Sequence, residues 1–527
     1  MPEFIGAVDQ GTTSSRFLIF DKQGNLITHH QIELEQEYPC PGWVEHDPYK
    51  ILESVLTCIE NTIARFELMG HKISDIKGRL KWITRREIKA NVDCVQLAIG
   101  ITNQRETTLM WDRKTGKPLH NAIVWSDVRT DELVHQLKKR PDSDIVVDRC
   151  GLEITSYFSA VKLAWLLKND KNVAEAAKEK RAAFGTVDSW LLYNLSGGAD
   201  GGSHCTDVTN ASRTLLMNLK SLKWDPELLK FFDIPDHVLP SLVSSSEKYG
   251  EVHKGVLKGV PITSCMGDQQ AALLGQKCFD KGDAKSTFGT GAFMLFNTGT
   301  TAVKSSHGLI TTVAFQLGRN AKPNYALEGS VAVAGSSLRW LRDNLRLIDS
   351  MEQVSELASR VQDTGGVYFV TAFSGLFAPY WRDDARGTMV GLTSYTNKYH
   401  LARATFESMS FQTRAILESM NLDATVPLKV LKVDGGVSNS DVAMQIQADL
   451  LGIEVHRPAM RETTALGVAI AAGLAVGVWK GVHELDQVNQ KGTTVFVPHL
   501  DKEAREEKYQ AWRRAVEASY NWTDVEC

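Results

Sequence analysis

The chain has 527 residues, of which 43% are apolar and 23% charged, and a formal net charge of −4 at neutral pH. A chain of this length is too long for one hydrophobic core, so two domains are expected. A charge this close to zero gives no electrostatic footprint for nucleic acid or an anionic membrane surface. The longest uncharged apolar stretch, 465–479, is shorter than the roughly 20 residues that a membrane-spanning helix needs. We expect a buried helix there, no integral membrane segment and no nucleic-acid partner.

The cysteines and the first residues of the chain bear on its compartment. The eight cysteines are scattered, and none forms a CxxC pair, so neither a disulfide framework nor a zinc site is expected. Residues 1–4 lead directly into a predicted strand, without the apolar leader of a secretory signal. These features favour a cytoplasmic protein with reduced thiols.

The first half of the chain alternates predicted strands and helices. Antiparallel strands are expected at 4–8, 16–20 and 26–33. Asp47 and Pro48, an N-cap followed by a first-turn proline, predict the start of a helix that runs to residue 66. Further on we expect a strand at 95–101 and helices at 130–138, 159–167 and 188–195.

The second half repeats this order. A hairpin at 285–296 is followed by a predicted helix at 335–345, a strand at 366–371, a helix at 400–420 and a strand at 430–433. Strands alternating with helices predict an α/β fold. Glycines near 275–283 interrupt the pattern, which predicts domains at 1–276 and 277–527.

One short motif occurs in both halves. Residues 4–20 and 284–296 each read as strand, Gly-Thr turn, strand, with Gly11-Thr12 matching Gly289-Thr290. Backbone N–H groups of such turns can bind phosphate. Two turns, one per half, can clamp a polyphosphate, a layout similar to that of the actin, hexokinase and sugar-kinase ATPases. The Walker and GxGxxG motifs are absent from the sequence, which excludes P-loop and Rossmann sites.

Two carboxylates next to predicted turns are candidates for phosphoryl transfer. Asp9 ends a strand before the first Gly-Thr turn, where it can hold Mg²⁺ or simply close an Asx turn. Asp268, before a predicted helix, can cap that helix. It can also accept the proton of an alcohol as a general base.

Two further segments follow apolar strands. Arg105-Glu106 offers donors and an acceptor suited to vicinal hydroxyls, at a strand end where α/β proteins bind ligands. Taken alone, an exposed ion pair of little energetic value is the better interpretation. Asp434-Gly-Gly436 can let an adenine approach the backbone, although a plain strand-to-helix turn explains it equally simply.

These segments resemble, in order and over nearly the whole chain, the glycerol-phosphorylating members of the FGGY carbohydrate-kinase family. Any one motif is weak evidence, whereas so many in register are very specific. The matching stretches are 9–16, 41–47, 100–108, 121–125, 184–188, 209–213, 267–272, 288–291, 325–329 and 433–436, and the two signature regions of the family resemble 157–170 and 387–407.

The resemblance implies two actin-like, ribonuclease H-like α/β domains with a nucleotide and substrate cleft between them. It also implies transfer of a phosphoryl group from ATP to glycerol, giving sn-glycerol 3-phosphate and ADP, by an Mg²⁺-dependent cytoplasmic homo-oligomer, a dimer in this family. We expect catalysis to require closure of the domains.

The resemblance also assigns roles to individual residues. Glycerol hydroxyls would contact Arg105, Glu106, Tyr157, Asp268 and Gln269. Asp268 would be the general base, and Trp125 and Phe293 would form the apolar wall. Phosphates would be held by Thr12, Thr13, Ser14 and Arg16 and by Gly289 and Thr290, the nucleotide would be bordered by Gly335, Gly436 and Ser440, and Mg²⁺ would be held by Asp9.

Three positions depart from the family pattern. Ser440 stands where many members have Asn, with Asn439 one residue earlier, so a nucleotide hydrogen bond is shifted or lost. Arg339 stands where bacterial members tend to have Gln, and we expect no particular contact from it. The Gly-rich loop that binds fructose bisphosphate in bacterial members is not evident at 252–261, so that regulation is expected to be absent.

A locally basic insert at 78–97 also departs from the family. It is interpreted as a surface loop for an acidic partner, as a tolerated excursion, or as an unspliced intron in the gene model. We expect it to be dispensable for the chemistry.

Two other functions remain open from the sequence. Another sugar or polyol kinase of the family is disfavoured by Arg105-Glu106 with Trp125 and Asp268-Gln269. A catalytically silent actin-like scaffold is disfavoured by Asp268 and by both Gly-Thr turns.

Overall fold

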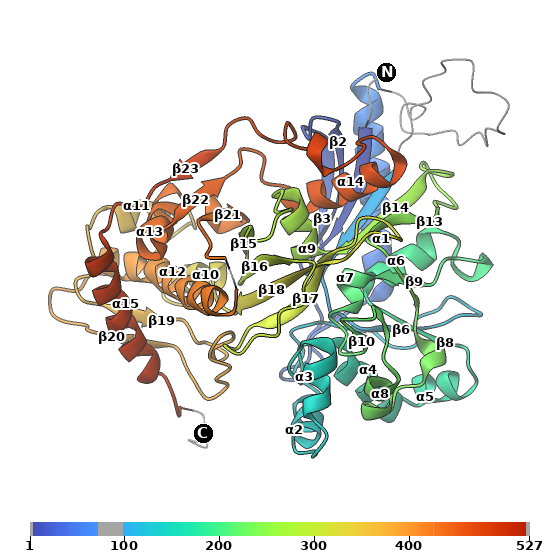
Figure 1. The fold of residues 1–527 in the computed structure, drawn as a ribbon, viewed down its shortest axis with the longest axis horizontal. Helices are drawn as coiled ribbons and strands as arrows, with labels where there is room; N and C mark the ends of the chain where they lie inside the picture. Colours follow the sequence, from blue (N-terminus) through green and yellow to red (C-terminus); the bar gives the residue numbers. More distant parts are fainter. Residues whose placement is uncertain (1–3, 72–97, 425, 523–527) are drawn as a thin grey trace. The chain divides into compact units, whose positions relative to one another are not determined.

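The computed structural model describes residues 4–71, 98–424 and 426–522, so the insert predicted at 78–97 lies outside the described residues. The chain divides into two compact units (Figure 1). Unit 1 comprises 1–277, 312–325 and 463–489, and unit 2 comprises 278–311, 326–462 and 490–527. The domain division at 276/277 stays a prediction. Two later segments of the chain are grouped with unit 1.

The main sheet of unit 1 has six strands in the order β13-β14-β5-β1-β2-β3. β1 (Phe4–Gln10) pairs antiparallel with β2 (Ser14–Asp21) and parallel with β5 (Ile99–Asn103). β5 in turn pairs parallel with β14 (Pro261–Gly267). Every residue of β1, β5 and β14 is buried, as expected of central parallel strands. The three antiparallel strands predicted at the start of the chain are confirmed, with β3 (Leu26–Glu33) at the edge.

A second main sheet, most of whose strands belong to unit 2, has seven strands in the order β17-β18-β16-β15-β21-β22-β23. β15 (Ala284–Phe288) forms a hairpin with β16 (Ala292–Gly299) and pairs parallel with β21 (Val430–Asp434). β21 pairs parallel with β22 (Glu454–Arg457). A hairpin with a Gly-Thr turn, followed by two parallel strands, therefore occurs in both units. The repeat in the sequence is a repeat of the fold.

Helix α1 (Pro48–Leu68) shows how sequence pattern becomes packing. Asp47 caps it by accepting a hydrogen bond from the Tyr49 amide at 2.8 Å. Its apolar positions at helical spacing, Ile51, Val55 and Ile59 among them, are buried in the core of unit 1. The predicted helix is confirmed, including its capping residue.

Helix α14 (Thr463–Val476) is the buried helix predicted from the apolar stretch. It packs on α9 (Asp268–Gly275), and glycines permit the contact. A Cβ on Gly467 would lie 1.8 Å from the Ala271 carbonyl oxygen. The two backbones therefore touch, and α14 supports the helix that follows β14.

The remaining elements do not alternate strictly, because in places several helices or several strands follow one another. The other strands are β4 (Glu45–His46), β6 (Leu109–Asp112), β7 (Ala122–Ile123), β8 (Ala182–Gly185), β9 (Cys205–Asp207), β10 (Met217–Asn218), β11 (Lys223–Trp224), β12 (Ser241–Val243), β13 (Ser246–Glu251), β17 (Ile310–Phe315), β18 (Asn324–Val331), β19 (Tyr368–Val370), β20 (Thr388–Val390) and β23 (Thr494–Phe496). The other helices are α2 (Asp131–Lys138), α3 (Asp144–Cys150), α4 (Ser159–Asn169), α5 (Lys171–Lys178), α6 (Val187–Leu195), α7 (Val208–Ala211), α8 (Pro226–Phe231), α10 (Gly335–Asp343), α11 (Gln353–Ser359), α12 (Lys398–Asp423), α13 (Asp441–Leu451) and α15 (Lys502–Glu517).

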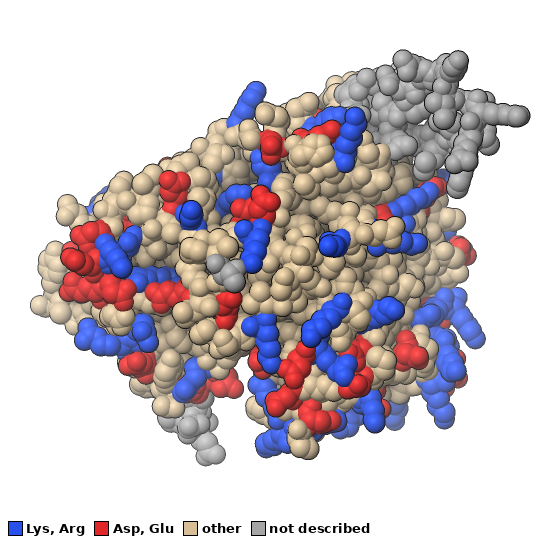
Figure 2. Space-filling model, in the orientation of Figure 1, with Lys and Arg blue, Asp and Glu red and all other residues tan. Residues whose placement is uncertain are grey.

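The surface shows no separation of charge on the face drawn in Figure 2, where basic and acidic side chains are interspersed. Within the described ranges, no helix is both long enough and apolar enough to cross a membrane.

Candidate active site

The carboxyl ends of three parallel strands of unit 1, β1, β5 and β14, are in register at one edge of its sheet. Asp9 of β1 is the register partner of Thr102 of β5, and Thr102 is the partner of Met266 of β14. In α/β proteins, ligands bind at the carboxyl ends of such strands. The segments that emerge at this edge are Gly11-Thr12, Arg105-Glu106 and Asp268-Gln269.

Arg105 and Glu106 form a buried pair. Both side chains are 2% exposed, and Arg105 Nε lies 3.8 Å from Glu106 Oε1. Glu106 has φ +61°, a left-handed conformation that costs a non-glycine residue about 1–3 kcal/mol and is concentrated at functional sites. The interpretation of this pair as an exposed surface contact is therefore wrong.

Arg213 is the nearest basic partner of Glu106. Its Nε lies 2.6 Å from Glu106 Oε1, and the guanidinium is fully buried. The same guanidinium stands over the rings of Tyr157 at 5.6 Å and Phe158 at 5.1 Å. Sequence reasoning quoted Arg213 only within a motif and missed this role, because 107 residues separate it from Glu106.

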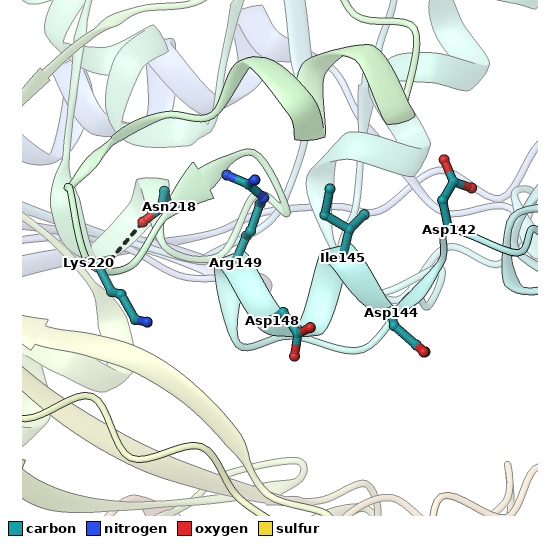
Figure 3. Close-up of a pocket in the computed structure, with 7 residues that line it drawn as sticks. All are labelled: Asp142, Asp144, Ile145, Asp148, Arg149, Asn218 and Lys220. Atoms are coloured by element: carbon teal, nitrogen blue, oxygen red, sulfur yellow. Dashed lines mark hydrogen bonds between the residues drawn. The ribbon is translucent and has the colours of Figure 1, made fainter.

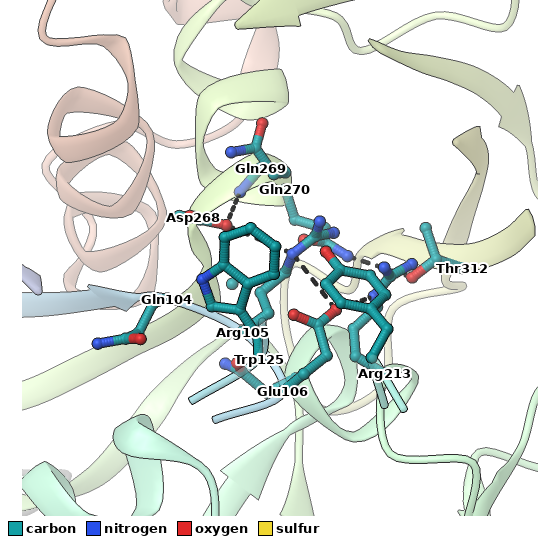
Figure 4. A network of polar contacts seen from close by, with 12 residues as sticks. Gln104, Arg105, Glu106, Trp125, Arg213, Asp268, Gln269, Gln270 and Thr312 are labelled. Atoms are coloured by element: carbon teal, nitrogen blue, oxygen red, sulfur yellow. Dashed lines mark hydrogen bonds and ion pairs between the residues drawn. The ribbon is translucent and has the colours of Figure 1, made fainter. Parts of the chain in front are cut away.

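Asp268 is the first residue of α9. Its Oδ1 lies 3.4 Å from Arg105 Nε and accepts a hydrogen bond from the Gln269 amide at 2.7 Å. The N-cap of α9 is Gly267, so the interpretation of Asp268 as a helix cap is wrong. The Asp268 side chain is 29% exposed while that of Arg105 is 2% exposed. The accessible carboxylate of Asp268 therefore lies beside the buried guanidinium of Arg105 (Figure 4).

A second layer of polar contacts holds Arg105. Its Nη1 donates to Gln270 Oε1 at 3.2 Å, and Gln270 Nε2 donates to Thr312 Oγ1 at 3.2 Å (Figure 4). A Cβ on Gly267 would lie 2.8 Å from Arg105 Cδ. The small residue before Asp268 therefore leaves room for the arginine.

Trp125 connects the predicted apolar wall to the first Gly-Thr turn. Its Nε1 donates to Thr12 Oγ1 at 2.9 Å. Its ring lies 5.5 Å from the Tyr157 ring in an edge-to-face arrangement. Phe293, the other predicted wall residue, lies in β16 of unit 2, opposite Thr287 of β15.

The first Gly-Thr turn is short and closed by its own backbone. The Gly11 amide donates to the Ser14 carbonyl at 2.9 Å, and the carbonyl of Thr13 accepts from the Leu34 amide at 2.9 Å. The Thr13 side chain is exposed. On the strands beside the turn, Arg16 forms an ion pair with Asp9.

A buried cation supports Tyr157. Lys162 Nζ donates to the carbonyls of Ser156, Tyr157 at 2.8 Å and Phe158 at 3.4 Å, the residues that precede α4. Burial lowers the pKa of Lys162 to about 7, against the opposing charge of Glu106. Sequence reasoning missed Lys162, because a single lysine in an apolar helix carries no local signal.

Unit 2 contains a hollow of about 720 Å³ at the second Gly-Thr turn. All five residues of this unit that the sequence assigned to nucleotide binding line it. They are Gly289, Thr290, Gly335, Gly436 and Ser440, and the remaining lining includes the apolar side chains of Leu338, Met351, Val437 and Val442.

The second turn is fixed to the start of α10. The Gly335 amide donates to the Gly289 carbonyl at 3.0 Å, and a Cβ on Gly335 would lie 2.5 Å from that oxygen. Arg339, for which no contact was predicted, lines the hollow and donates to Thr290 Oγ1 at 2.8 Å. By contrast, a Cβ on Gly436 would meet no protein atom within 4 Å.

Ser440, which stands where the family pattern has Asn, caps a helix. It is the N-cap of α13, where its Oγ accepts from the Ala443 amide at 3.0 Å, and Ser355 Oγ donates to it at 2.7 Å. Two acceptor bonds leave the hydroxyl proton of Ser440 to be donated elsewhere. Asn439 accepts from Arg461.

Two other features of the described residues bear on ligand binding. A hollow of about 500 Å³ on unit 1, lined by acidic and basic side chains including Asp142, Asp144 and Arg149, contains no residue predicted for the site (Figure 3). Within the described part of the chain, no three His, Cys, Asp or Glu residues are grouped so that they can hold a metal ion.

Known proteins are similar to this chain in sequence and in fold. Two family models match the chain: the N-terminal domain of the FGGY family of carbohydrate kinases over residues 4–275, and the C-terminal domain over 284–476. Glycerol kinase of Arabidopsis thaliana is 49% identical over 534 residues, covering 99% of this chain and 98% of the relative.

Solved structures agree with this assignment. Glycerol kinase of Plasmodium falciparum, crystallised with ADP, superposes with a TM-score of 0.87 at 37% identity and covers 98% of both chains. Gluconate kinase of Lactobacillus acidophilus, at 21% identity and a TM-score of 0.81 over 98% of both chains, shares the fold. On these matches, the chain belongs to the FGGY family of carbohydrate kinases.

Proposed function

We propose that the protein transfers the terminal phosphoryl group of ATP to glycerol, giving sn-glycerol 3-phosphate and ADP. The observation that carries the proposal is the Asp268 carboxylate, 3.4 Å from the buried Arg105 and beside the Arg105-Glu106 pair. Relatives named glycerol kinase at 49% and 37% identity support glycerol as the acceptor.

In this proposal, glycerol binds through its hydroxyls. Glu106 accepts a hydrogen bond from a hydroxyl, and Arg105 and the Gln269 side-chain amide donate. Buried polar groups that require a hydroxyl partner reject ligands lacking it, because the groups would otherwise be left unpaired. Trp125 and Tyr157 pack against the carbon chain, with Phe293 of unit 2 as a further wall residue.

The chemical step needs a base and a stabilised phosphoryl group. Asp268 accepts the proton of the attacking glycerol hydroxyl. As the proton leaves, the hydroxyl oxygen bonds to the terminal phosphorus of ATP, and the bond between that phosphorus and the ADP oxygen breaks. Such transfers depend mainly on positioning and electrostatics. Partial exposure lets Asp268 reach the substrate, and Arg105 Nε lies 3.4 Å from its Oδ1.

The phosphates are bound by both Gly-Thr turns in this proposal. Thr12, Thr13, Ser14 and Arg16 act from the first, and Gly289 and Thr290 from the second, through backbone amides and hydroxyls. Gly335, Gly436 and the hydroxyl proton of Ser440 border the nucleoside.

Mg²⁺ would be held at Asp9. A single carboxylate at the end of a buried strand suits this ion, which keeps most of its waters. When bound, Mg²⁺ neutralises charge on the phosphate oxygens. Arg16, paired with Asp9, would contact the phosphate oxygens in this proposal.

A family resemblance also supports a cytoplasmic homodimer, and sedimentation equilibrium tests the oligomeric state.

The function itself is tested by ADP release with glycerol, xylulose, gluconate or no acceptor, and by ³¹P NMR of the product. Glycerol-dependent ADP release with sn-glycerol 3-phosphate as product supports the proposal. A preference for another polyol, or ADP release without any acceptor dependence, overturns it in favour of a different kinase or of an ATPase module.

A further inference from the structure

A one-turn helix, α7, carries a buried polar cluster that contacts two of the substrate-bearing strands. Asp207, which precedes it, and Thr209 and Asn210 within it are fully buried. Their side chains form hydrogen bonds to Gly267 and Asn103, the last residues of β14 and β5. The cluster therefore connects the ends of two parallel strands that belong to distant parts of the sequence.

Asp207 is the centre of this cluster. Its two oxygens accept from the amides of Thr209 and Asn210 at 3.0 Å each, from Thr209 Oγ1 at 2.8 Å, from Asn210 Nδ2 at 3.0 Å and from Ser245 Oγ at 2.7 Å. Burial raises the pKa of Asp207, and the hydrogen bonds from these donors oppose that shift. Thr209 gives its hydroxyl proton to Asp207, so its oxygen serves as an acceptor for other groups.

The acceptor of Thr209 is used by the peptide before the proposed base. The Gly267 amide donates to Thr209 Oγ1 at 2.9 Å, and Asp268 is the next residue. This bond fixes the orientation of the peptide at the point where β14 ends and α9 begins. The Thr209 hydroxyl is held by its own bond to Asp207 Oδ1 at 2.8 Å, so the direction of the Gly267 amide is also fixed.

Asn210 acts in the same way on the other strand. Its side-chain amide exchanges two hydrogen bonds with that of Asn103, at 3.0 and 3.1 Å. Asn103 also donates to the Gln104 carbonyl at 2.8 Å. The turn that carries Arg105 and Glu106 follows directly.

We infer that Asp207, Thr209 and Asn210 are positioning residues for the reaction, with the Thr209 hydroxyl setting the direction of the Asp268 carboxylate. The inference rests on the proposed function of Asp268. A displacement of about 1 Å at a reacting group can cost about 100-fold in rate, so a hydroxyl that does not touch the substrate can control turnover.

The test replaces the hydroxyl while keeping the shape of the side chain. Thr209→Val removes the acceptor, and Thr209→Ser retains it. We expect kcat of T209V to fall about 10- to 100-fold, with the KM for ATP within about twofold of the native value, and T209S to recover most of the activity. Thr62→Val is the matched control, because Thr62 is fully buried and donates one hydrogen bond, to the Phe17 carbonyl at 3.0 Å, in helix α1.

Several outcomes overturn the inference. In one, T209V and T62V lose the same thermal stability and also have the same kcat. In another, the kcat of T209S falls as far as that of T209V. Should T209V not fold, Thr209→Cys preserves the volume with only a weak acceptor, and native kcat in T209C overturns the inference. Native protein without glycerol kinase activity would instead refute the proposed function, so the two failures are distinguishable.

Discussion

The proposed substrate site of unit 1 and the proposed nucleotide hollow of unit 2 are built in different ways. In unit 1 the polar groups are buried and paired: Arg105 and Glu106 are 2% exposed, and Glu106 is bonded to the buried Arg213. In unit 2, Gly289, Thr290, Arg339 and Gly436 are exposed, over an apolar floor.

The difference agrees with what each site would recognise in the proposed function. A small polyol offers only hydroxyls, so selectivity requires polar groups held in fixed places that lose hydrogen bonds with the wrong ligand. A nucleotide offers a large apolar ring and a charged chain, and backbone amides with room beside them are sufficient. We therefore expect side-chain changes to have large effects in unit 1 and backbone or steric changes to decide binding in unit 2.

The largest effect is expected for Asp268→Asn. The amide cannot accept the proton of the hydroxyl, and loss of a general base costs about 10²–10⁴-fold in kcat. ATP affinity, measured by calorimetry, should remain within about twofold, since the base does not bind the nucleotide.

The control for this variant is Asp144→Asn, an exposed carboxylate of unit 1 in the hollow of Figure 3. It should keep native kcat. If D268N retains more than about a tenth of native kcat, the assignment of the base is wrong and the comparison loses its main argument.

The next largest effect is expected for Arg213→Met. Removing one partner of a buried ion pair typically costs about 3–5 kcal/mol, because the other charge stays buried without compensation. Glu106 would keep the longer 3.8 Å contact with Arg105, so we expect lower thermal stability, by less than a fully unpaired charge would cause, and a KM for glycerol raised at least about tenfold, with the KM for ATP little changed.

Arg213→Lys is the matched variant for this prediction, since it keeps the charge but loses the planar fork. It should restore part of the glycerol affinity. Equal increases of the KM for glycerol and for ATP in R213M would show a general loss of folded protein instead of a local role at Glu106.

The sequence predicted the parts of both sites that are local in the chain. The two Gly-Thr hairpins and the helix after Asp268 are confirmed because turn residues and apolar strands are read within a short window. The strand predicted at 95–101 is found at Ile99–Asn103, and residues 95–97 lie outside the described residues. All five nucleotide residues assigned to unit 2 line one hollow, although their roles stay predictions.

The sequence did not predict which side chains, far apart in the chain, contact one another in the fold. The contact of Arg213 with Glu106 spans 107 residues, and that of Asn210 with Asn103 also spans 107. Local pattern likewise favoured an exposed Arg105-Glu106 pair, because burial depends on the sheet around it. Tertiary packing decides which charged side chains are buried, and local sequence pattern does not predict that packing.

A smaller effect is expected in unit 2 for Gly436→Ala. The added methyl group meets no protein atom within 4 Å, so the fold should be unchanged. If the nucleotide occupies the hollow, the methyl group overlaps it, and overpacking of this kind costs about 1–3 kcal/mol. We expect ATP to bind about tenfold more weakly by calorimetry, with native thermal stability and a native KM for glycerol.

Gly335→Ala provides the contrast, because its methyl group would lie 2.5 Å from the Gly289 carbonyl oxygen. It should lower both thermal stability and ATP affinity. Native ATP affinity in G436A would show that the nucleotide does not border this glycine.

The smallest effect on catalysis, essentially none, is expected for His204→Gln, which probes the buried interior of unit 1 by pH. His204 Nε2 is hydrogen-bonded to the Phe184 carbonyl at 2.7 Å, and burial lowers the pKa of His204 to about 4 from 6.5. Between these pH values the unfolded chain binds the proton and the folded protein does not, so stability falls as the pH drops. At about 1.4 kcal/mol for each pKa unit, the loss from pH 6.5 to 4 approaches about 3 kcal/mol.

Asp188 acts in the opposite direction over part of this range. Burial raises its pKa to about 6 from 3.8, so the folded protein binds the proton first and gains stability as the pH falls from 6 toward 4. Comparing urea unfolding of the native protein and of H204Q at pH 7, 5.5 and 4.5 cancels the contribution of Asp188. H204Q should lose less stability than the native protein on acidification, with unchanged kcat at pH 7. Parallel losses in both proteins would show that His204 is not held neutral, and that the interior of unit 1 is less enclosed than the comparison with unit 2 requires.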